Sequence, residues 1–123
     1  MKKIKQDKIS KIVEILKSIK PYKIILFGSQ AYGEEREDSD IDLLVVTNDN
    51  VMPKNFNESM QYYFKVADTL DEIRENVPMD LIVHTIPMFK RFLELDSMFS
   101  REVLRNGKIL YERDYERMAW GIG

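Results

Sequence analysis

The amino-acid sequence predicts an α/β (α+β) fold, in which a small mixed β-sheet carries helices packed mainly on one face. Two observations lead to this prediction. Stripes of apolar residues at helical spacing alternate along the chain with short runs of β-branched and apolar residues that are typical of strands. The chain is also short, with 123 residues of which 44% are hydrophobic, which suits one core. We therefore expect a single domain over residues 1–123.

The first half of the chain contains one predicted helix and two predicted strands. The helix is indicated by apolar residues three and four positions apart: Ile9, Ile12, Val13, Leu16 and Ile19. Pro21 ends this helix, because proline disfavours helical geometry in the residue before it. Residues 23–27 predict a buried strand, and residues 30–33 a short helical turn. Residues 40–47 predict a second strand, which is apolar on both faces after its first residues and so lies inside a covered sheet.

In the second half of the chain, predicted helices and strands alternate again. A second amphipathic helix is indicated by a further stripe: Met60, Tyr63, Phe64, Ala67, Leu70 and Ile73. Residues 79–85 predict a third strand, and residues 87–106 a helical region that breaks near Ser97. Gly107 is expected to cap that region, because glycine is common at helix C-termini. Residues 108–111 predict a short last strand.

Composition and charge favour a cytoplasmic protein that neither enters a membrane nor binds nucleic acid sequence-specifically. The formal net charge is −2, and no apolar run reaches transmembrane length. The absence of cysteine excludes disulfides and thiolate metal sites. The N-terminal residues lack the apolar stretch of a signal peptide, and the eight lysines within residues 1–23 read as a solvated helix face.

Gly28 and Ser29 follow the first predicted strand and could bind an anion. Glycine has no Cβ, so its backbone can approach a ligand closely. If a helical turn starts after Ser29, its free N–H groups favour an anion, and the serine hydroxyl adds a donor. The alternative is an ordinary strand-to-helix turn in which Ser29 is an N-cap.

Three aspartates stand at the starts of predicted strands and could bind metal ions. Asp40 and Asp42 are two residues apart, so their side chains leave the same face of a strand. Two carboxylates this close are unfavourable without a cation between them, and Mg²⁺ accepts such ligands. Asp80 opens the third strand and could complete the site or take a proton from an attacking hydroxyl. The alternative is a solvated turn with Asp42 at a strand edge.

Other residues that invite a functional interpretation are assigned structural roles. His84 is the only histidine, and it shares a face with Asp80 in an alternating strand. We nevertheless interpret it as structural, because carboxylates suffice for the chemistry above. Aromatic residues at helical spacing are assigned to the core, with a partner-facing role for some of them as the alternative: Tyr62, Tyr63, Phe64, Phe89, Phe92 and Phe99.

These motifs resemble the nucleotidyltransferase fold of the polymerase-β type, and in particular its minimal nucleotidyltransferase (MNT) members. The hallmark of the family is Gly-Ser, ten residues, then Asp-x-Asp, and this chain has Gly28-Ser29 followed after ten residues by Asp40-Ile41-Asp42. The resemblance implies that Gly28 and Ser29 hold the triphosphate. It also implies that Asp40, Asp42 and Asp80 are catalytic and bind two Mg²⁺ ions.

The resemblance further implies an activity and a partner. Stand-alone members are typically antitoxins of HEPN/MNT modules, in a type VII-like toxin–antitoxin pair. They transfer AMP from ATP to a hydroxyl of the helical HEPN toxin, with pyrophosphate leaving. We therefore expect a protein adenylyltransferase with ATP as its substrate and a HEPN protein as its partner. A homodimer is left open.

One departure from the family motif supports an alternative. Many relatives carry arginines in the turn after Gly-Ser, where this chain has Gln30 and Tyr32. The alternative is a non-catalytic antitoxin that neutralises a HEPN ribonuclease by occlusion. A small-molecule transferase acting on an aminoglycoside is less well supported, because no acceptor pocket can be assigned from the sequence.

Overall fold

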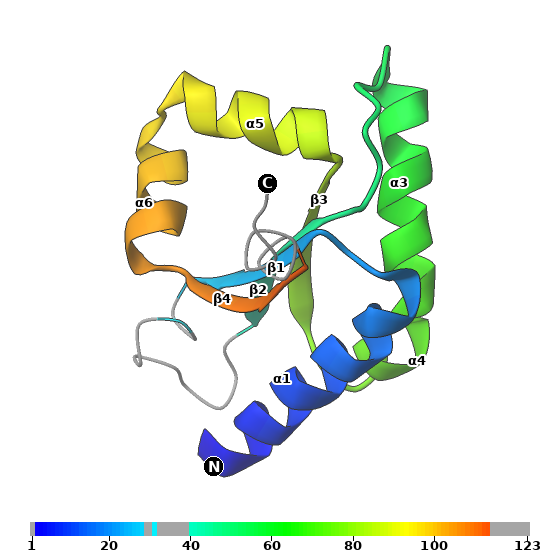
Figure 1. Ribbon diagram of the computed structural model, residues 1–123. Helices are drawn as coiled ribbons and strands as arrows, with labels where there is room; N and C mark the ends of the chain where they lie inside the picture. Colours follow the sequence, from blue (N-terminus) through cyan, green and yellow to red (C-terminus); the bar gives the residue numbers. More distant parts are fainter. Residues whose placement is uncertain (1, 29–30, 32–39, 114–123) are drawn as a thin grey trace.

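The computed structural model describes residues 2–28, 31 and 40–113, and Figure 1 shows how their helices and strands alternate. The mixed α/β class is therefore confirmed. In chain order the elements are α1 (Lys2–Leu16), the 3-10 helix η1 (Lys17–Ile19), β1 (Lys23–Phe27), β2 (Ile41–Val46), α3 (Phe56–Thr69), α4 (Asp71–Arg74), β3 (Met79–His84), α5 (Ile86–Leu95), α6 (Met98–Asn106) and β4 (Lys108–Glu112).

The four strands form one mixed sheet in the order β3-β2-β1-β4. β1 runs antiparallel to β2 and to β4, whereas β2 and β3 are parallel. A parallel pair needs a crossover connection, and α3 and α4 supply it. The mixed sheet predicted from the sequence is thus confirmed.

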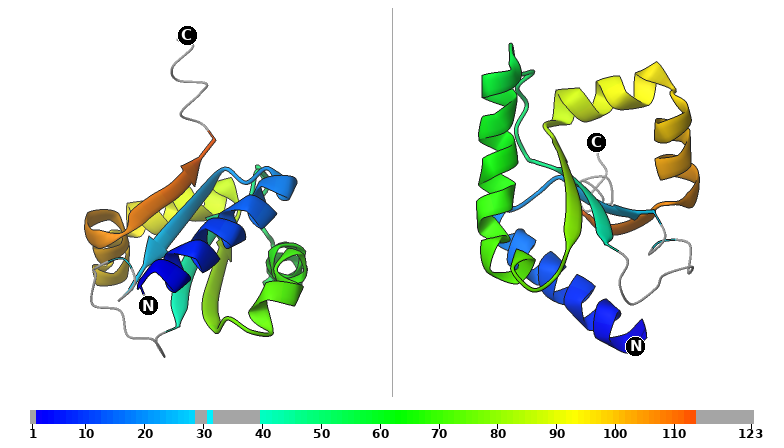
Figure 2. Two further views of the ribbon diagram at one scale, coloured as in Figure 1. Left: turned by 90° about the horizontal axis from the view of Figure 1, so that it is seen from below. Right: turned by 180° about the vertical axis from the view of Figure 1, so that it is seen from behind.

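Helices lie on both sides of this sheet (Figure 2). α1 and α3 cover one face over the larger core, whose central residues are Ile12, Leu16, Ile24, Leu43, Val45, Val66 and Leu70. α5 and α6 cover the other face over a smaller core, whose buried residues are Ile25, Leu44, Val46, Phe89 and Val103. The sequence predicted helices mainly on one face of the sheet. The larger core does lie on one face, but α5 and α6 cover the second face as well. β1 and β2 are apolar on both faces, so each face needs a cover.

Local capping defines the helices after β2. The Asn55 side chain accepts a hydrogen bond from the Glu58 backbone N–H at the start of α3. The predicted break near Ser97 is confirmed, because Asp96 is left-handed (φ 49°) and the Ser97 hydroxyl caps α6. Gly107 ends α6 as predicted, but in an extended conformation and not a left-handed one. A Cβ there would overlap the Val103 carbonyl oxygen, so glycine is needed for close approach.

Two aromatic residues assigned to the core are exposed. Phe64 is 51% exposed on α3, and Phe99 is 40% exposed on α6. Phe89 is buried as predicted. All three residues occur at helical spacing in the sequence. Spacing alone therefore does not predict whether such a residue packs against the sheet or faces solvent. Within the described ranges, no helix is both long and apolar enough to cross a bilayer.

Leu43→Ala should lower the free energy of unfolding by about 2–5 kcal/mol, because Leu43 is fully buried between the sheet and its larger core. Chemical denaturation monitored by circular dichroism measures this change. Leu104→Ala is the matched control, since Leu104 is 58% exposed and its truncation should change stability by less than about 0.5 kcal/mol. Equal losses in the two variants would contradict the assignment of the core.

Candidate active site

The predicted site residues gather at one end of the sheet, where β1 ends and where β2 and β3 begin. In the antiparallel β1–β2 pair, Phe27 is opposite Asp42. In the parallel β2–β3 pair, Asp42 is in register with Asp80. Adjacent residues of neighbouring strands project to the same face, so Asp42 and Asp80 lie side by side.

This pair lies on the face of the sheet that α5 and α6 cover. Side chains alternate along a strand, so Asp42 shares its face with Leu44 and Val46, and Asp80 shares its face with Ile82. Leu44, Val46 and Ile82 all belong to the smaller core under α5 and α6. The carboxylates of Asp42 and Asp80 therefore lie on the same face of the sheet as these apolar residues, at the end of the strands that α5 and α6 do not cover.

The electrostatic environment of Asp42 is unfavourable for a bare carboxylate. Burial, a side-chain hydrogen bond with Asp80, and repulsion from the Asp80 and Asp40 carboxylates raise the pKa of Asp42 to about 6. Burial makes the largest contribution. Asp42 therefore binds a proton more readily than an ordinary aspartate does, and a divalent cation could replace that proton.

Gly28 passes directly beside the Asp42 carboxylate. Its φ of +74° lies in the left-handed region, which favours glycine. A Cβ at this position would overlap Asp42 Oδ2. The turn continues with a hydrogen bond from the Ala31 N–H to the Gly28 carbonyl oxygen at 3.0 Å. The absence of a Cβ therefore lets the Asp42 carboxylate pack directly against the backbone of Gly28.

The predicted ligand set is brought together only in part. Asp42 and Asp80 are adjacent, and Asp40 is exposed just before β2 begins. Among the described residues, no three His, Cys, Asp or Glu side chains converge closely enough to hold an ion as they stand. Asp42 and Asp80, with the raised pKa of Asp42 and the Gly28 backbone beside it, still fit a hard cation with oxygen ligands. Ser29, the other predicted phosphate-binding residue, lies outside the described residues, as do Gln30 and Tyr32.

His84 lies away from this end of the sheet, at the last position of β3. Its ring packs against Phe89 and Phe92, with centroid distances of 6.4 and 5.3 Å. Burial lowers its pKa, so the ring is neutral at neutral pH. These contacts agree with the structural role predicted for it.

The sequence analysis did not identify the aromatic neighbours of the carboxylates. Phe27 is the last residue of β1, and its ring makes an edge-to-face contact with Phe99 of α6, with centroids 5.5 Å apart. Because Phe27 is opposite Asp42, one aromatic contact links α6 to the end of the sheet that carries the aspartates. In the sequence, the only indication that Phe27 lies near the site is its position directly before Gly28. No local pattern predicts that its ring contacts Phe99.

Mg²⁺ affinity should increase as the pH rises towards about 6 and then level off. Below the raised pKa of Asp42, a cation must displace a proton, which costs about tenfold in affinity per pH unit. The same raised pKa means that Asp42 destabilises the folded metal-free chain progressively between the ordinary aspartate pKa of 3.8 and about 6. The Mg²⁺-dependent increase in Tm at pH 5, 6, 7 and 8 measures this effect, and a pH-independent increase would contradict it.

Gly28→Ala should lower the Tm and abolish the increase in Tm caused by Mg²⁺. The left-handed backbone costs a residue with a Cβ about 1–2 kcal/mol, and the new Cβ displaces Asp42. Gly107→Ala is the matched control, because its Cβ meets the Val103 carbonyl oxygen and not a carboxylate. The control should lose stability yet keep its response to Mg²⁺; loss of the response in both variants would refute the specific role of Gly28.

Comparison with known proteins relates this geometry to a family. Residues 10–116 match the family model described as "Polymerase beta, Nucleotidyltransferase". Two relatives from Methanocaldococcus jannaschii both carry the name "Putative protein adenylyltransferase". One is 33% identical over 72% of this chain and 77% of its own length. The other is 36% identical over 74% of this chain and 96% of its own length.

Solved structures with the same fold agree with this relationship. A nucleotidyltransferase from Sulfolobus solfataricus has a TM-score of 0.56 and 22% identity, and the match covers 88% of this chain and 80% of that one. A toxin–antitoxin structure with AMP-PNP has a TM-score of 0.52 and 24% identity, covering 87% of this chain and 75% of that one. The chain belongs to the polymerase-β nucleotidyltransferase family, and it is a nucleotidyltransferase.

Proposed function

We propose that this chain is a Mg²⁺-dependent adenylyltransferase that transfers AMP from ATP to a hydroxyl of a partner protein. The observation that carries the proposal is the pair of Asp42 and Asp80, in register on two strands, with the Gly28 backbone packed against the Asp42 carboxylate. A partly buried carboxylate with a raised pKa, next to a second carboxylate, is costly to fold and is typical of a functional site.

The residues have distinct roles in this reaction. The Gly28-Ser29 turn binds the triphosphate through its backbone, and Asp40, Asp42 and Asp80 hold two Mg²⁺ ions. When bound, these ions supply charge neutralisation at the phosphates and at the attacking oxygen. The acceptor oxygen forms a bond to the α-phosphorus as the bond to the β-phosphate oxygen breaks, and pyrophosphate leaves. Asp80 is exposed beside Asp42 and is placed to accept the hydroxyl proton.

A protein acceptor suits the architecture and the relatives. We propose that residues 1–123 form one nucleotidyltransferase domain and that the acceptor hydroxyl belongs to another molecule. The two relatives above carry names that specify protein as the acceptor. The MNT resemblance and a neighbour of the same fold, titled as a toxin–antitoxin with AMP-PNP, support the role of an antitoxin. The acceptor we propose is a HEPN-family toxin, modified in the cytoplasm.

Asp42→Asn should reduce transfer of AMP by at least about 100-fold, because the variant removes a charged ligand from the reacting phosphate. The chain is incubated with ATP, Mg²⁺ and the helical protein encoded by an adjacent reading frame, and the partner is weighed by intact mass spectrometry. Asp49→Asn is the control: Asp49 is half-buried and pairs with Lys65 at 3.5 Å, away from the strand starts that form the site. The control should transfer AMP at the wild-type rate.

The same experiment separates catalysis from occlusion. An unmodified partner, or transfer that persists in Asp42→Asn, would refute the enzymatic proposal. If the wild-type chain and Asp42→Asn neutralise the partner equally without modifying it, the chain is a binding module, as the departures at Gln30 and Tyr32 would favour.

A further inference from the structure

α6 packs on β1 through one row of residues: Phe99, Val103 and Gly107. Successive members of the row are four positions apart, so they lie along one side of the helix and its C-terminal cap. Val103 is buried in the smaller core, and β1 lies so close to Gly107 that an added Cβ would be in tight contact with the strand. The Phe99 ring contacts the ring of Phe27, the last residue of β1, with centroids 5.5 Å apart. Phe99 is therefore the member of the row that meets the end of the strand.

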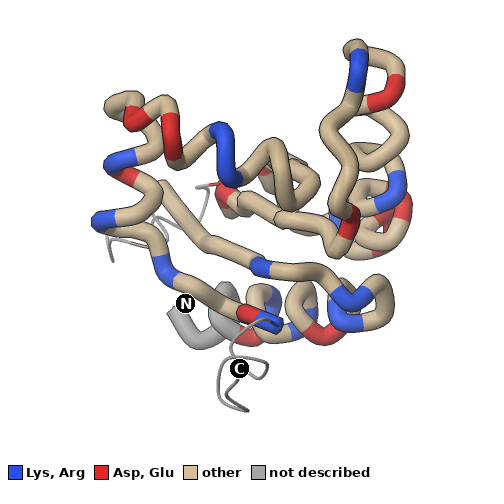
Figure 3. Tube along the Cα trace, turned by 45° about the horizontal axis from the view of Figure 1, so that its top comes forward, with Lys and Arg blue, Asp and Glu red and all other residues tan. Residues whose placement is uncertain are grey.

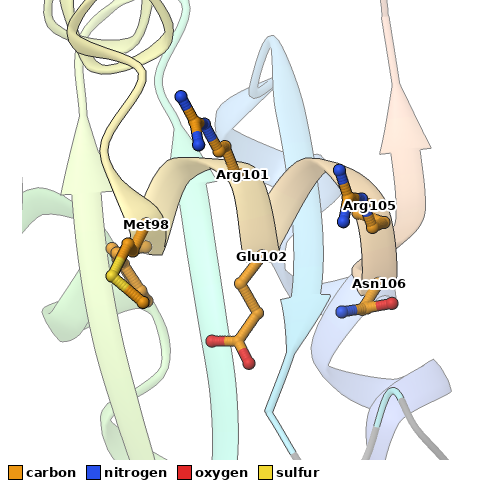
Figure 4. A pocket seen from close by; sticks show the side chains of 6 residues that line it. Met98, Arg101, Glu102, Arg105 and Asn106 are labelled. Atoms are coloured by element: carbon orange, nitrogen blue, oxygen red, sulfur yellow. The ribbon is translucent and has the colours of Figure 1, made fainter.

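The outward side of α6 is polar and lines a pocket of about 550 Å³, where Figure 4 shows Glu102 and Arg105. Figure 3 shows charges of both signs along α5 and α6, and Arg101 makes a bidentate pair with Asp96 at 2.9 and 2.8 Å. Phe99 stands at the border of the two sides, because it also lines this pocket and is 40% exposed. A ring that is exposed to this extent contributes less to the core than a buried one, so burial alone does not account for it.

Phe27 is the cross-strand neighbour of Asp42. The two residues are partners in the antiparallel β1–β2 pair, so their side chains project to the same face, with Cβ atoms about 4.5–5.5 Å apart. Both residues are half-buried. Phe27 also directly precedes Gly28, whose backbone lies so close to Asp42 that a Cβ would overlap Oδ2. Phe27 thus borders Asp42 through its own side chain and through the residue that follows it.

A series of ring contacts holds Phe27 from the side of the helices. Phe99 makes edge-to-face contacts with Phe27, at an interplanar angle of 79°, and with Phe92 of α5, at 72°. Phe92 in turn stacks on Phe89, with centroids 6.0 Å apart, and Phe89 is only 4% exposed. The series therefore begins in the smaller core and ends beside Asp42. Functional side chains keep a precise geometry when the residues around them are fixed by packing in this way.

We propose that Phe27 and Phe99 are positioning residues for the transfer reaction. The Phe99 ring packs Phe27 against β2, and Phe27 holds the Asp42 carboxylate and the Gly28 backbone in their relative positions. This inference rests on the proposed function and adds two residues to its site. The effect of both rings passes through Asp42 and Gly28, so neither is a catalytic residue. Residues that orient the ligands of a metal typically change affinity or activity by about 10–100-fold when they are mutated.

NMR of the metal-free chain tests the positioning directly. Phe27-Gly28 is the only Phe-Gly dipeptide in the sequence, so protein labelled with carbonyl-¹³C phenylalanine and ¹⁵N glycine gives one correlation, which reports the Gly28 amide. Phe99→Leu should shift this signal, because the edge-to-face contact that fixes Phe27 is lost. Phe99→Tyr should leave the signal close to its wild-type position, because the ring is kept and the exposed edge gives its hydroxyl access to water.

Phe64→Leu is the matched control. Phe64 is 51% exposed and makes an edge-to-face contact with Tyr63, with centroids 5.7 Å apart, but it lies on α3. The control removes a ring of similar exposure and contact geometry, so it should leave the Gly28 signal unchanged.

The same variants are then compared in the transfer of AMP and in the increase in Tm caused by Mg²⁺. Phe99→Leu and Phe27→Leu should each lower kcat about tenfold and reduce the response to Mg²⁺, with the KM for the partner protein unchanged. Phe99→Tyr should restore both quantities, and Phe64→Leu should match the wild type.

The outcomes separate this inference from the proposed function. If the wild-type chain neither responds to Mg²⁺ nor transfers AMP, the proposed function fails and the positioning role fails with it. If the wild type is active, an unchanged Gly28 signal or an unchanged kcat in Phe99→Leu refutes the positioning role alone. Equal losses of kcat in Phe99→Leu and Phe64→Leu would also overturn it, because the effect would then reflect general destabilisation.

Discussion

The constraint on which the site depends is the register between two parallel strands. Asp42 is aligned with Asp80 across β2 and β3, on a face whose buried residues are apolar, and Gly28 lets the Asp42 carboxylate lie directly against its backbone. Two carboxylates at the border of a core repel each other and lose hydration, which is the reason that the pKa of Asp42 is raised. Nothing in the packing of the fold requires acids at these positions. Their cost is explained if the folded chain meets a cation and a polyphosphate there.

Local chemistry in the sequence was sufficient to predict most of the elements. β1 occupies the predicted residues, and β3 ends one residue earlier than predicted, because β-branched runs bounded by proline or glycine mark strands clearly. The period of two also predicted Asp40 and Asp42 on one face, but β2 begins at Ile41, after Asp40. The register of Asp42 with Asp80 was not predictable in the same way. It is set by a crossover through α3 and α4, and no local pattern encodes the pairing of residues so far apart.

The packing of α5 and α6 over the smaller core was the part of the fold that the sequence predicted least well. α5 and α6 follow the periodicity expected of them, but periodicity does not say which sheet face a helix will cover. The structure places them over Leu44 and Val46, and a series of aromatic contacts then runs from Phe89 through Phe92 and Phe99 to Phe27. This series joins the structural His84 at one end of the sheet to the carboxylates at the other. Phe99 is 40% exposed, which contradicts its assignment to the core, although its ring contacts both Phe27 and Phe92.

The order of the strands also affects how the chain emerges during synthesis. β1, which precedes Gly28, and the strands that carry Asp42 and Asp80 are complete by residue 84, whereas β4 is the last described element and covers the free side of β1. Until residues 108–112 leave the ribosome, β1 is an unpaired edge whose sequence Lys-Ile-Ile-Leu-Phe is almost entirely apolar. Such an edge readily pairs with other chains. Nascent or truncated chains that lack β4 would therefore be prone to aggregation although they already contain every predicted catalytic residue.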